Sequence, residues 1–142
     1  MFNDSINFVA QSIEKSLLVN HNGILYQKYT NFFNEFYLKK IDAGTGTLPF
    51  DRLETQEHKQ RKKFSSKELI VKELTILFMH KRVKSVLEDI YQTSLKFSSC
   101  DIWLDDAGYW LPPHIDDNRI KLGLQVYCSK EPNSGTTFFS TD

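Results

Sequence analysis

The sequence has little cysteine, no excess of charge of either sign and no long apolar run. Two cysteines in 142 residues, Cys100 and Cys128, are too few for a disulfide scaffold, and we expect both to be reduced, buried thiols. The 18 basic residues balance the 18 acidic ones, so composition predicts neither a nucleic-acid partner nor a membrane partner. No apolar run reaches the length that crosses a bilayer.

What is present fits one modest domain with a real core. Hydrophobic residues make up 40% of the chain and charged residues 25%, which is ordinary for a globular protein. The 11 phenylalanines and 6 tyrosines favour a fold with much sheet. Residues 1–18 are amphipathic and carry acidic side chains, so we expect neither a signal peptide nor an anchor there. From the two reduced cysteines we expect a cytoplasmic protein.

The first part of the chain, residues 1–96, has mainly helical periodicity. Apolar residues from Ile6 to Leu17 recur at helical spacing, and Ser65 stands three residues before Glu68, which is the pattern of a capping box. The stretch 31–40 suits either a short helix or a strand. The expected elements are a helix over 4–18, closed by Gly23, a strand over 24–29, and helices over 66–79 and 83–95.

Two polar segments in this part favour loops over binding sites. Residues 42–49 contain two glycines, but no Gly-Lys-Ser/Thr follows, so a surface loop is favoured over a phosphate loop. Residues 51–63 end in a basic run, yet Glu54 and Glu57 offset its charge and no aromatic residue interrupts it. A solvated linker or helix face is therefore predicted there.

From residue 97 to 142 the periodicity changes to that of strands. Pro112 and Pro113 exclude a helix around them, and the apolar residues from Ile120 to Val126 alternate with Lys121, Gly123 and Gln125. We predict strands over 101–105, 109–116, 120–126 and 135–140, with turns at 106–108 and 117–118. Short strands separated by turns indicate an antiparallel sandwich or barrel, so the chain is predicted to be a single α+β domain.

His114 and Asp116 are the candidate functional residues. In an extended backbone, residues two positions apart point to the same side, so the imidazole and the carboxylate would face the same space. Together they provide two of the three ligands of a non-haem Fe(II) facial triad. A His-x-Asp motif alone is a weak signal, and a polar pair beside a turn is the alternative.

The residues around this motif resemble the Fe(II)/2-oxoglutarate-dependent oxygenases, particularly their prolyl-hydroxylase-like branch. Members of that branch have a glycine six residues before His-x-Asp, then an apolar strand that ends in tyrosine, then Gly-x-Thr-x-Phe. This chain matches in order and spacing with Gly108, His114-Ile-Asp116, LGLQVY ending at Tyr127, and Gly135-Thr-Thr-Phe-Phe139.

The resemblance implies helices packed on a double-stranded β-helix, or jelly-roll, with Fe(II) bound near one mouth. It implies that His114 and Asp116 are iron ligands and that 2-oxoglutarate is a small-molecule co-substrate in the hydroxylation of a C–H bond. The tyrosine that often contacts the co-substrate in the family corresponds to Asp105 here. Tyr109 and Tyr127 are possible replacements, with packing as the alternative role for each.

The family's third ligand, a distal histidine followed by Arg or Lys, has no counterpart after Asp116. The other histidines, His21, His58 and His80, precede the predicted strands in helical or loop contexts. We expect an incomplete jelly-roll, truncated in its C-terminal half, which binds Fe(II) weakly through two ligands and turns over poorly or not at all. Open strand edges would favour self-association.

Two other functions are also consistent with the sequence. The first is a non-catalytic jelly-roll module for binding or assembly, in which the His-x-Asp motif is incidental. The second is another cupin-like metal protein, which would need further His or Glu ligands. The substrate is not predicted by the sequence.

Overall fold

The computed structural model describes residues 2–45, 50–128, 135 and 137–138. Within these ranges the chain is α+β, as predicted, with four helices and two small antiparallel sheets. The helices are α1 (Phe2–Lys15), α2 (Glu35–Thr45), α3 (Leu69–Met79) and α4 (Lys81–Tyr91). The strands are β1 (Val19–His21), β2 (Ile24–Tyr26), β3 (Phe50–Gln56), β4 (Lys59–Phe64) and β5 (Trp103–Asp105).

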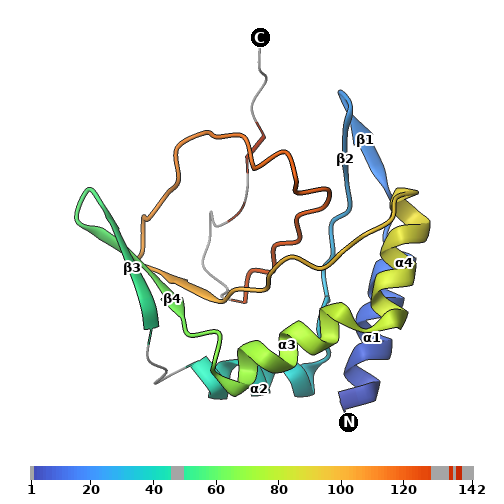
Figure 1. Ribbon diagram of the computed structural model, residues 1–142, viewed down its shortest axis with the longest axis horizontal. Coiled ribbons are helices and arrows are strands. Elements are labelled where there is room, and N and C mark those ends of the chain that lie inside the picture. Colours follow the sequence, from blue (N-terminus) through green and yellow to red (C-terminus); the bar gives the residue numbers. More distant parts are fainter. Residues whose placement is uncertain (1, 46–49, 129–134, 136, 139–142) are drawn as a thin grey trace.

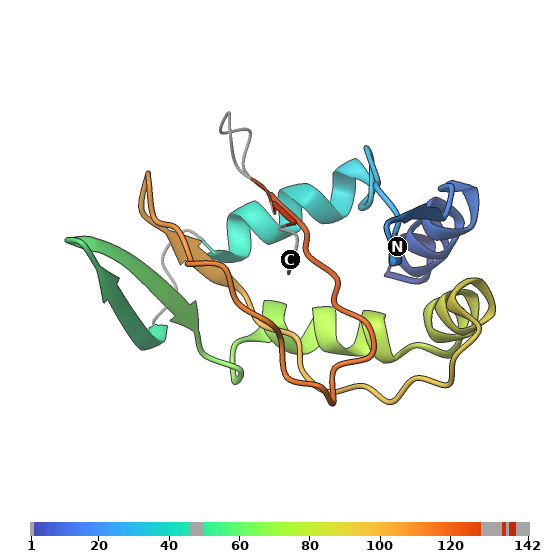
Figure 2. The same ribbon diagram turned by 90° about the horizontal axis from the view of Figure 1, so that it is seen from above.

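The helices form one side of the molecule, and the sheets stand at its two ends. The three-stranded sheet lies at one end, α1 and α4 lie with the β1–β2 hairpin at the other, and α2 and α3 span the distance between them (Figure 1). The C-terminal segment, orange to red, lies in the space between these two ends in both views (Figures 1 and 2). The helical side thus supports a long irregular segment.

The core is made by the helices together with two phenylalanines from the connection before α2. Each helix contributes apolar side chains at helical spacing, and α1 packs on α4, α4 on α3 and α3 on α2. Phe32 and Phe33 meet edge to face with ring centroids 5.0 Å apart, which fills the space beside α2. The buried core residues are Ile6, Val9, Ala10, Ile13, Phe32, Phe33, Tyr37, Ile41, Ile70, Val71, Leu74, Leu77, Val83, Val86 and Leu87.

The three-stranded sheet runs in the order β3-β4-β5, with antiparallel pairs throughout. Residues 51–63, predicted to be a linker or a helix face, form most of its β3–β4 hairpin instead, so that prediction was wrong. The turn is made by Glu57 and His58, which both adopt positive φ, at 46° and 66°. Two of its basic side chains are compensated by acidic ones from the later part of the chain, Arg61 by Asp105 at 2.7 Å and Lys63 by Asp101 at 2.9 Å.

Several helix boundaries also differ from those predicted. Residues 42–45 belong to α2 rather than to a loop, while 46–49 lie outside the described residues. Ser65 accepts from the amide of Lys67 at 3.2 Å, but α3 begins only at Leu69, so the Ser65–Glu68 pair is not a capping box. Gly23, with φ of 83°, closes the β1–β2 hairpin rather than α1.

The C-terminal segment is less regular than predicted. Trp103–Asp105 forms β5, but residues 109–116 and 120–126 are in no hydrogen-bonded strand, so those two strand predictions were wrong. The predicted alternation itself is present: Leu122, Leu124 and Val126 are half-buried against the helical core, while the residues between them are exposed. The segment therefore packs through one face without pairing as a strand. The predicted strand over 135–140 lies largely outside the described residues.

Both cysteines are free thiols, but they are not equally buried. Cys100 is half-buried against the core, whereas Cys128 is exposed, so the prediction of burial was wrong for Cys128. Burial, together with the Asp101 carboxylate, raises the pKa of the Cys100 thiol to about 11. Across the described ranges, every helix is too short or too polar to cross a bilayer.

Candidate metal-binding pair

The chain reaches the candidate site through a turn that follows β5 directly. The Asp106 amide donates to the carbonyl of Gln60 at 2.8 Å, and the Gln60 amide donates to the Asp106 carboxylate at 2.9 Å. Gly108 then adopts φ of 79°, a conformation that side chains other than glycine rarely take, and the chain reverses. This glycine explains the predicted turn at 106–108 and fixes where the following segment starts.

His114 and Asp116 point to the same space, as the His-x-Asp spacing predicts. Nε2 of His114 lies 3.2 Å from Oδ1 of Asp116, although the backbone between them is not part of a sheet. Both side chains face solvent, with exposed fractions of 56% for His114 and 68% for Asp116. The pair is therefore formed locally by the chain and is open to an incoming ligand.

The orientation of the His114 ring is set by the carbonyl of Pro112. Nδ1 of His114 lies 2.9 Å from that oxygen, and because a carbonyl can only accept, Nδ1 is the donor. The other nitrogen, Nε2, is then the one directed at the Asp116 carboxylate. Two hydrogen-bond acceptors at this distance repel each other unless a proton or a cation lies between them. Metal-binding histidines in proteins are oriented by the same kind of carbonyl contact.

The spacing of the two donor atoms fits a divalent ion of the first transition row. Two neighbouring ligands of an octahedral ion, at bonds of about 2.1 Å and a right angle, are about 3.0 Å apart. The observed separation is 3.2 Å. Over the residues that the structure describes, however, no group of three or more His, Cys, Asp or Glu side chains is arranged to hold an ion. The separation of the two donors fits two adjacent positions of a metal site, and it is equally that of a direct hydrogen bond between a protonated imidazole and a carboxylate.

The neighbouring carboxylate, Asp117, is occupied by Arg119. The guanidinium of Arg119 contacts both Asp117 oxygens, at 2.9 Å from Nε and 2.6 Å from Nη2. These hydrogen bonds lower the pKa of the Asp117 carboxyl. The predicted turn at 117–118 is present, since the Ile120 amide donates to the Asp117 carbonyl at 2.9 Å. Asp116 is therefore the carboxylate of this loop that faces the imidazole.

Tyr109, a predicted co-substrate contact, packs on the three-stranded sheet. Its ring lies 5.0 Å from the guanidinium carbon of Arg61, and its hydroxyl is 3.4 Å from the Glu54 carboxylate. Arg61 also lies 4.9 Å from the Trp103 ring and makes a bidentate ion pair with Asp105, at 2.7 and 2.9 Å. These contacts give Tyr109 a packing role in this arrangement.

Tyr127, the other predicted co-substrate contact, lies at the end of the alternating segment. Its hydroxyl donates to the side-chain oxygen of Gln125 at 2.8 Å, and the side chain is half-exposed. The structure brings the two predicted metal ligands within 3.2 Å of each other, while Tyr109 contacts Arg61 and Glu54 and Tyr127 contacts Gln125.

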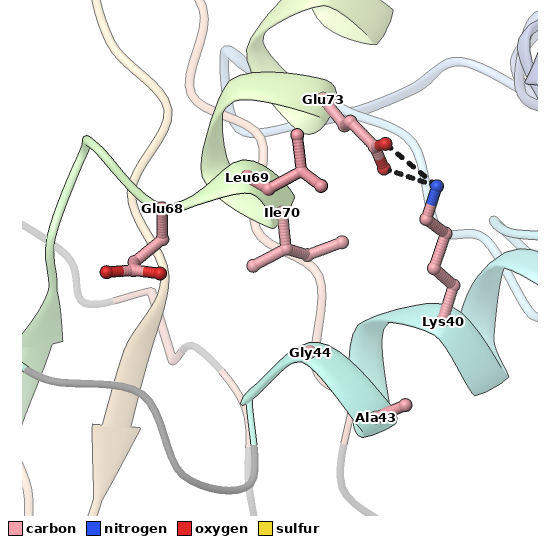
Figure 3. Close-up of a pocket in the computed structure, with 7 residues that line it drawn as sticks. All are labelled: Lys40, Ala43, Gly44, Glu68, Leu69, Ile70 and Glu73. Atoms are coloured by element: carbon pink, nitrogen blue, oxygen red, sulfur yellow. Dashed lines mark hydrogen bonds and ion pairs between the residues drawn. The ribbon is translucent and has the colours of Figure 1, made fainter.

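The hollow between α2 and α3 is separate from this pair. It has a volume of about 350 Å³ and is lined by apolar groups such as Ile70 and Leu69, with Lys40 on one wall and Glu73 on the other (Figure 3). Lys40 Nζ lies 2.7 Å from a Glu73 oxygen, so each charge already has its partner. Gly44 lets the helices approach closely here, because a Cβ at that position would lie 3.3 Å from Ile70.

No family model, no curated protein and no solved structure matches this chain at a significant level. The resemblance to the oxygenases therefore stands on the motif residues alone.

Two contributions to the site were not predicted from the sequence. One is the Pro112 carbonyl, which sets the ring of His114; the Pro-Pro-His run that fixes the backbone there is the signal that could have indicated it. The other is Arg61, which holds Trp103 and Tyr109 in place before the loop. The uninterrupted polar run of β4, KQRKK, gave no signal in the sequence for this role.

Proposed function

We propose that this chain carries the His-x-Asp part of the iron site of an Fe(II)/2-oxoglutarate-dependent oxygenase, with His114 and Asp116 as two of the ligands. The single observation that supports it best is the distance of 3.2 Å between His114 Nε2 and Asp116 Oδ1. The order and spacing of Gly108, the ligand pair and Tyr127 add the resemblance to that family.

Each residue of the site has a defined part in this proposal. When bound, Fe(II) with O₂ and 2-oxoglutarate supplies the chemistry that hydroxylates a C–H bond and releases succinate and CO₂. Asp116 contributes negative charge to the dication, and neutral His114 contributes a nitrogen lone pair. The Pro112 carbonyl keeps the proton of the imidazole on Nδ1, which leaves Nε2 available to the metal.

The finer fold proposed with this function is a double-stranded β-helix over residues 97–142, in which the irregular segments 109–116 and 120–126 would pair as strands. Two features support it. Leu122, Leu124 and Val126 already present one apolar face to the core, as an inner strand of such a fold does. Large apolar side chains of the same part are exposed, which suits a surface that another layer covers. They are Leu104, Trp110, Leu111, Ile115, Ile120, Tyr127 and Phe138.

The proposal is tested by anaerobic titration of the chain with Fe(II) in the presence of 2-oxoglutarate. We expect saturable binding and the visible charge-transfer band that this co-substrate gives with iron. His114→Ala and Asp116→Ala should each weaken the apparent affinity for Fe(II) by about tenfold or more, because each removes one of two protein ligands. Both residues are exposed, so the fold should survive both changes.

The matched control is His58→Ala, which removes an exposed histidine from the β3–β4 turn without touching the pair. It should leave Fe(II) binding unchanged. Equal loss of affinity in His58→Ala and His114→Ala would contradict the assignment of the ligands. Unchanged binding in both ligand variants would do the same.

A second function, a non-catalytic jelly-roll module for assembly, is favoured by one observation. The residues from 110 to 121 are all exposed, including Trp110, Leu111 and Ile115, and exposed apolar groups of this kind are typical of contact surfaces. Iron titration separates the two functions. A chain that binds neither Fe(II) nor 2-oxoglutarate, yet associates with a protein partner, would favour the module.

A further inference from the structure

The three-stranded sheet has a long open edge along β3. In the order β3-β4-β5, strand β3 pairs only with β4 among the described residues, and it lies on the outside of the sheet in both views (Figures 1 and 2). It has seven residues, Phe50–Gln56, whereas β5 at the opposite edge has three. An open edge strand has backbone amide and carbonyl groups that can pair with another strand. The edge of β3 is therefore the longer pairing surface of this sheet.

The register of the sheet decides which groups of β3 point outward. Both backbone groups of Gln60 bond to Asp106, on the side away from β3, so Gln60 has none for its cross-strand partner Thr55. Hydrogen-bonded and non-hydrogen-bonded pairs alternate along an antiparallel ladder, so Leu53, two residues before Thr55, is in the same position. The amide and carbonyl groups of Leu53 and Thr55 are thus directed to the open side.

The charge pattern of β3 is self-complementary about Leu53. When a second β3 runs antiparallel with the two Leu53 residues opposite each other, Arg52 of each copy lies opposite Glu54 of the other. Opposite charges across from each other stabilise a strand pair, and like charges destabilise it. A two-fold axis at residue 52 would bring two arginines together, and one at residue 54 would bring two glutamates together. The register about Leu53 is therefore favoured.

The same register covers an exposed apolar side chain. Leu53 is 46% exposed. The Cα atoms of a hydrogen-bonded antiparallel pair are about 5.5 Å apart, so two opposite leucines contact each other. Because neighbouring residues of a strand point to opposite faces, the leucines meet on one face of the sheet and the Arg52–Glu54 pairs form on the other.

We infer that two copies of this chain associate through β3, antiparallel and centred on Leu53, so that their sheets join into one. A two-fold axis makes the contact isologous, and the assembly closes as a dimer. The bulge between Phe50 and Arg52 limits the regular overlap to the residues after Phe50, so the contact is small and the dimer is weak. The inference is independent of the proposed function, since the edge contains neither His114 nor Asp116.

The inference is tested by sedimentation equilibrium of the whole chain over a concentration series. We expect a monomer of 16.6 kDa at low concentration and twice that mass at high concentration. Leu53→Lys should raise the dimer Kd by about tenfold or more, because two ammonium groups then lie opposite each other at the axis. The matched control is Leu104→Lys in β5. Leu104 is 54% exposed and, like Leu53, lies opposite Lys62, so this variant should dimerise as the unaltered chain does.

Charge reversal tests the register itself. Arg52→Glu should weaken the dimer because acidic groups then lie opposite each other, and the double variant Arg52→Glu/Glu54→Arg should restore it because opposite charges face each other again. Hydrogen exchange should show the amides of Leu53 and Thr55 protected in the dimer and exchanging in the dilute monomer. Far-UV circular dichroism verifies that each variant is folded.

The contrary outcomes are distinct. A chain that is monomeric at every concentration would overturn the inference and leave the proposed metal ligands untouched. A dimer that is equally strong in Leu53→Lys, or equally weakened in Leu104→Lys, would overturn it as well, since association would then use another surface. A folded double variant that does not recover dimerisation would contradict the register about Leu53.

Discussion

At the scale of single residues, His80 and His114 show how the backbone decides what a histidine does. Nδ1 of His80 accepts from the amide of Arg82 at 3.2 Å and caps the start of α4. Nδ1 of His114 instead donates to the Pro112 carbonyl at 2.9 Å, which directs Nε2 toward Asp116. The same side chain is a helix cap at one position and a candidate metal ligand at the other.

Cys100 leads to a prediction about stability at high pH. Its thiol has a pKa of about 11 in the folded protein because burial disfavours the thiolate, against 9.0 without that burial. Between these values the unfolded chain releases the proton while the folded protein retains it. The free energy of unfolding should therefore be unaffected by this group below pH about 9 and should fall as the pH rises to about 11.

The measurement is urea unfolding of the unaltered chain and of Cys100→Ala at several pH values across that window. The variant should show a shallower fall of the unfolding free energy from pH about 9 to about 11, because it lacks the titrating thiol. Burial also raises the pKa of Tyr37 and Tyr29, so these phenols add to the fall in both proteins, and the difference between the two slopes isolates the thiol. Identical slopes in the two proteins would contradict the prediction.

At the scale of elements, β4 joins the two parts of the chain. Its residues pair with β3 on one side and with β5 on the other, so a strand from the first part holds the strand that leads to His114. Arg61 is central to this pairing, since it forms the ion pair with Asp105 and lies between the rings of Trp103 and Tyr109. Hydrogen bonds to Asp105 raise the pKa of its guanidinium.

Arg61→Ala should lower the free energy of unfolding by about 1–2 kcal/mol, from the loss of one bidentate ion pair and two cation–π contacts that are partly exposed. Arg61→Lys should recover only part of the lost unfolding free energy, because an ammonium group keeps the charge but not the planar, bidentate contact. Chemical denaturation of the two variants measures both differences.

The control for this prediction is Lys59→Ala on the same strand, where the side chain is exposed. It should change the unfolding free energy by no more than about 0.5 kcal/mol. If Lys59→Ala were as destabilising as Arg61→Ala, general loss of positive charge rather than the Arg61 contacts would account for the effect.

At the scale of the whole molecule, the buried apolar side chains are distributed unevenly along the chain. The helices and the connection before α2 contain nearly all of the buried apolar residues, whereas the segment after β5 has many exposed ones. Local stability follows buried contacts and protected hydrogen bonds. The helical side is therefore expected to stay folded under conditions in which the loop that carries the metal pair opens.

Limited proteolysis with trypsin should reveal this division. The first cuts should follow Arg119 and Lys121, which are exposed and lie in irregular backbone, and cuts in α4 after Lys84 should come later. Mass spectrometry of an early time course identifies the order. First cleavage inside α4 would contradict the division.

The sequence by itself determined the features that depend on neighbouring residues. The helical spacing of apolar residues was sufficient to predict α1, α3 and α4, because each of these helices packs on the core through one apolar stripe. The spacing of His114 and Asp116 was enough to place both on one side, because two positions along an extended backbone bring side chains to the same face. The Asp106-Ala-Gly108 turn follows from a glycine at positive φ.

Only the tertiary structure decided which segments pair and which side chains are covered. The charged run 59–63 is a strand between β3 and β5, and Arg61 and Lys63 form ion pairs there with Asp105 and Asp101, which are distant in the sequence. Residues 120–126 alternate as a strand does, but they form no backbone hydrogen bonds with a neighbouring strand. A strand is stable only when another strand lies beside it, and alternation within one segment does not bring that neighbour. Alternation arises within a segment, whereas pairing depends on what the rest of the chain brings beside it.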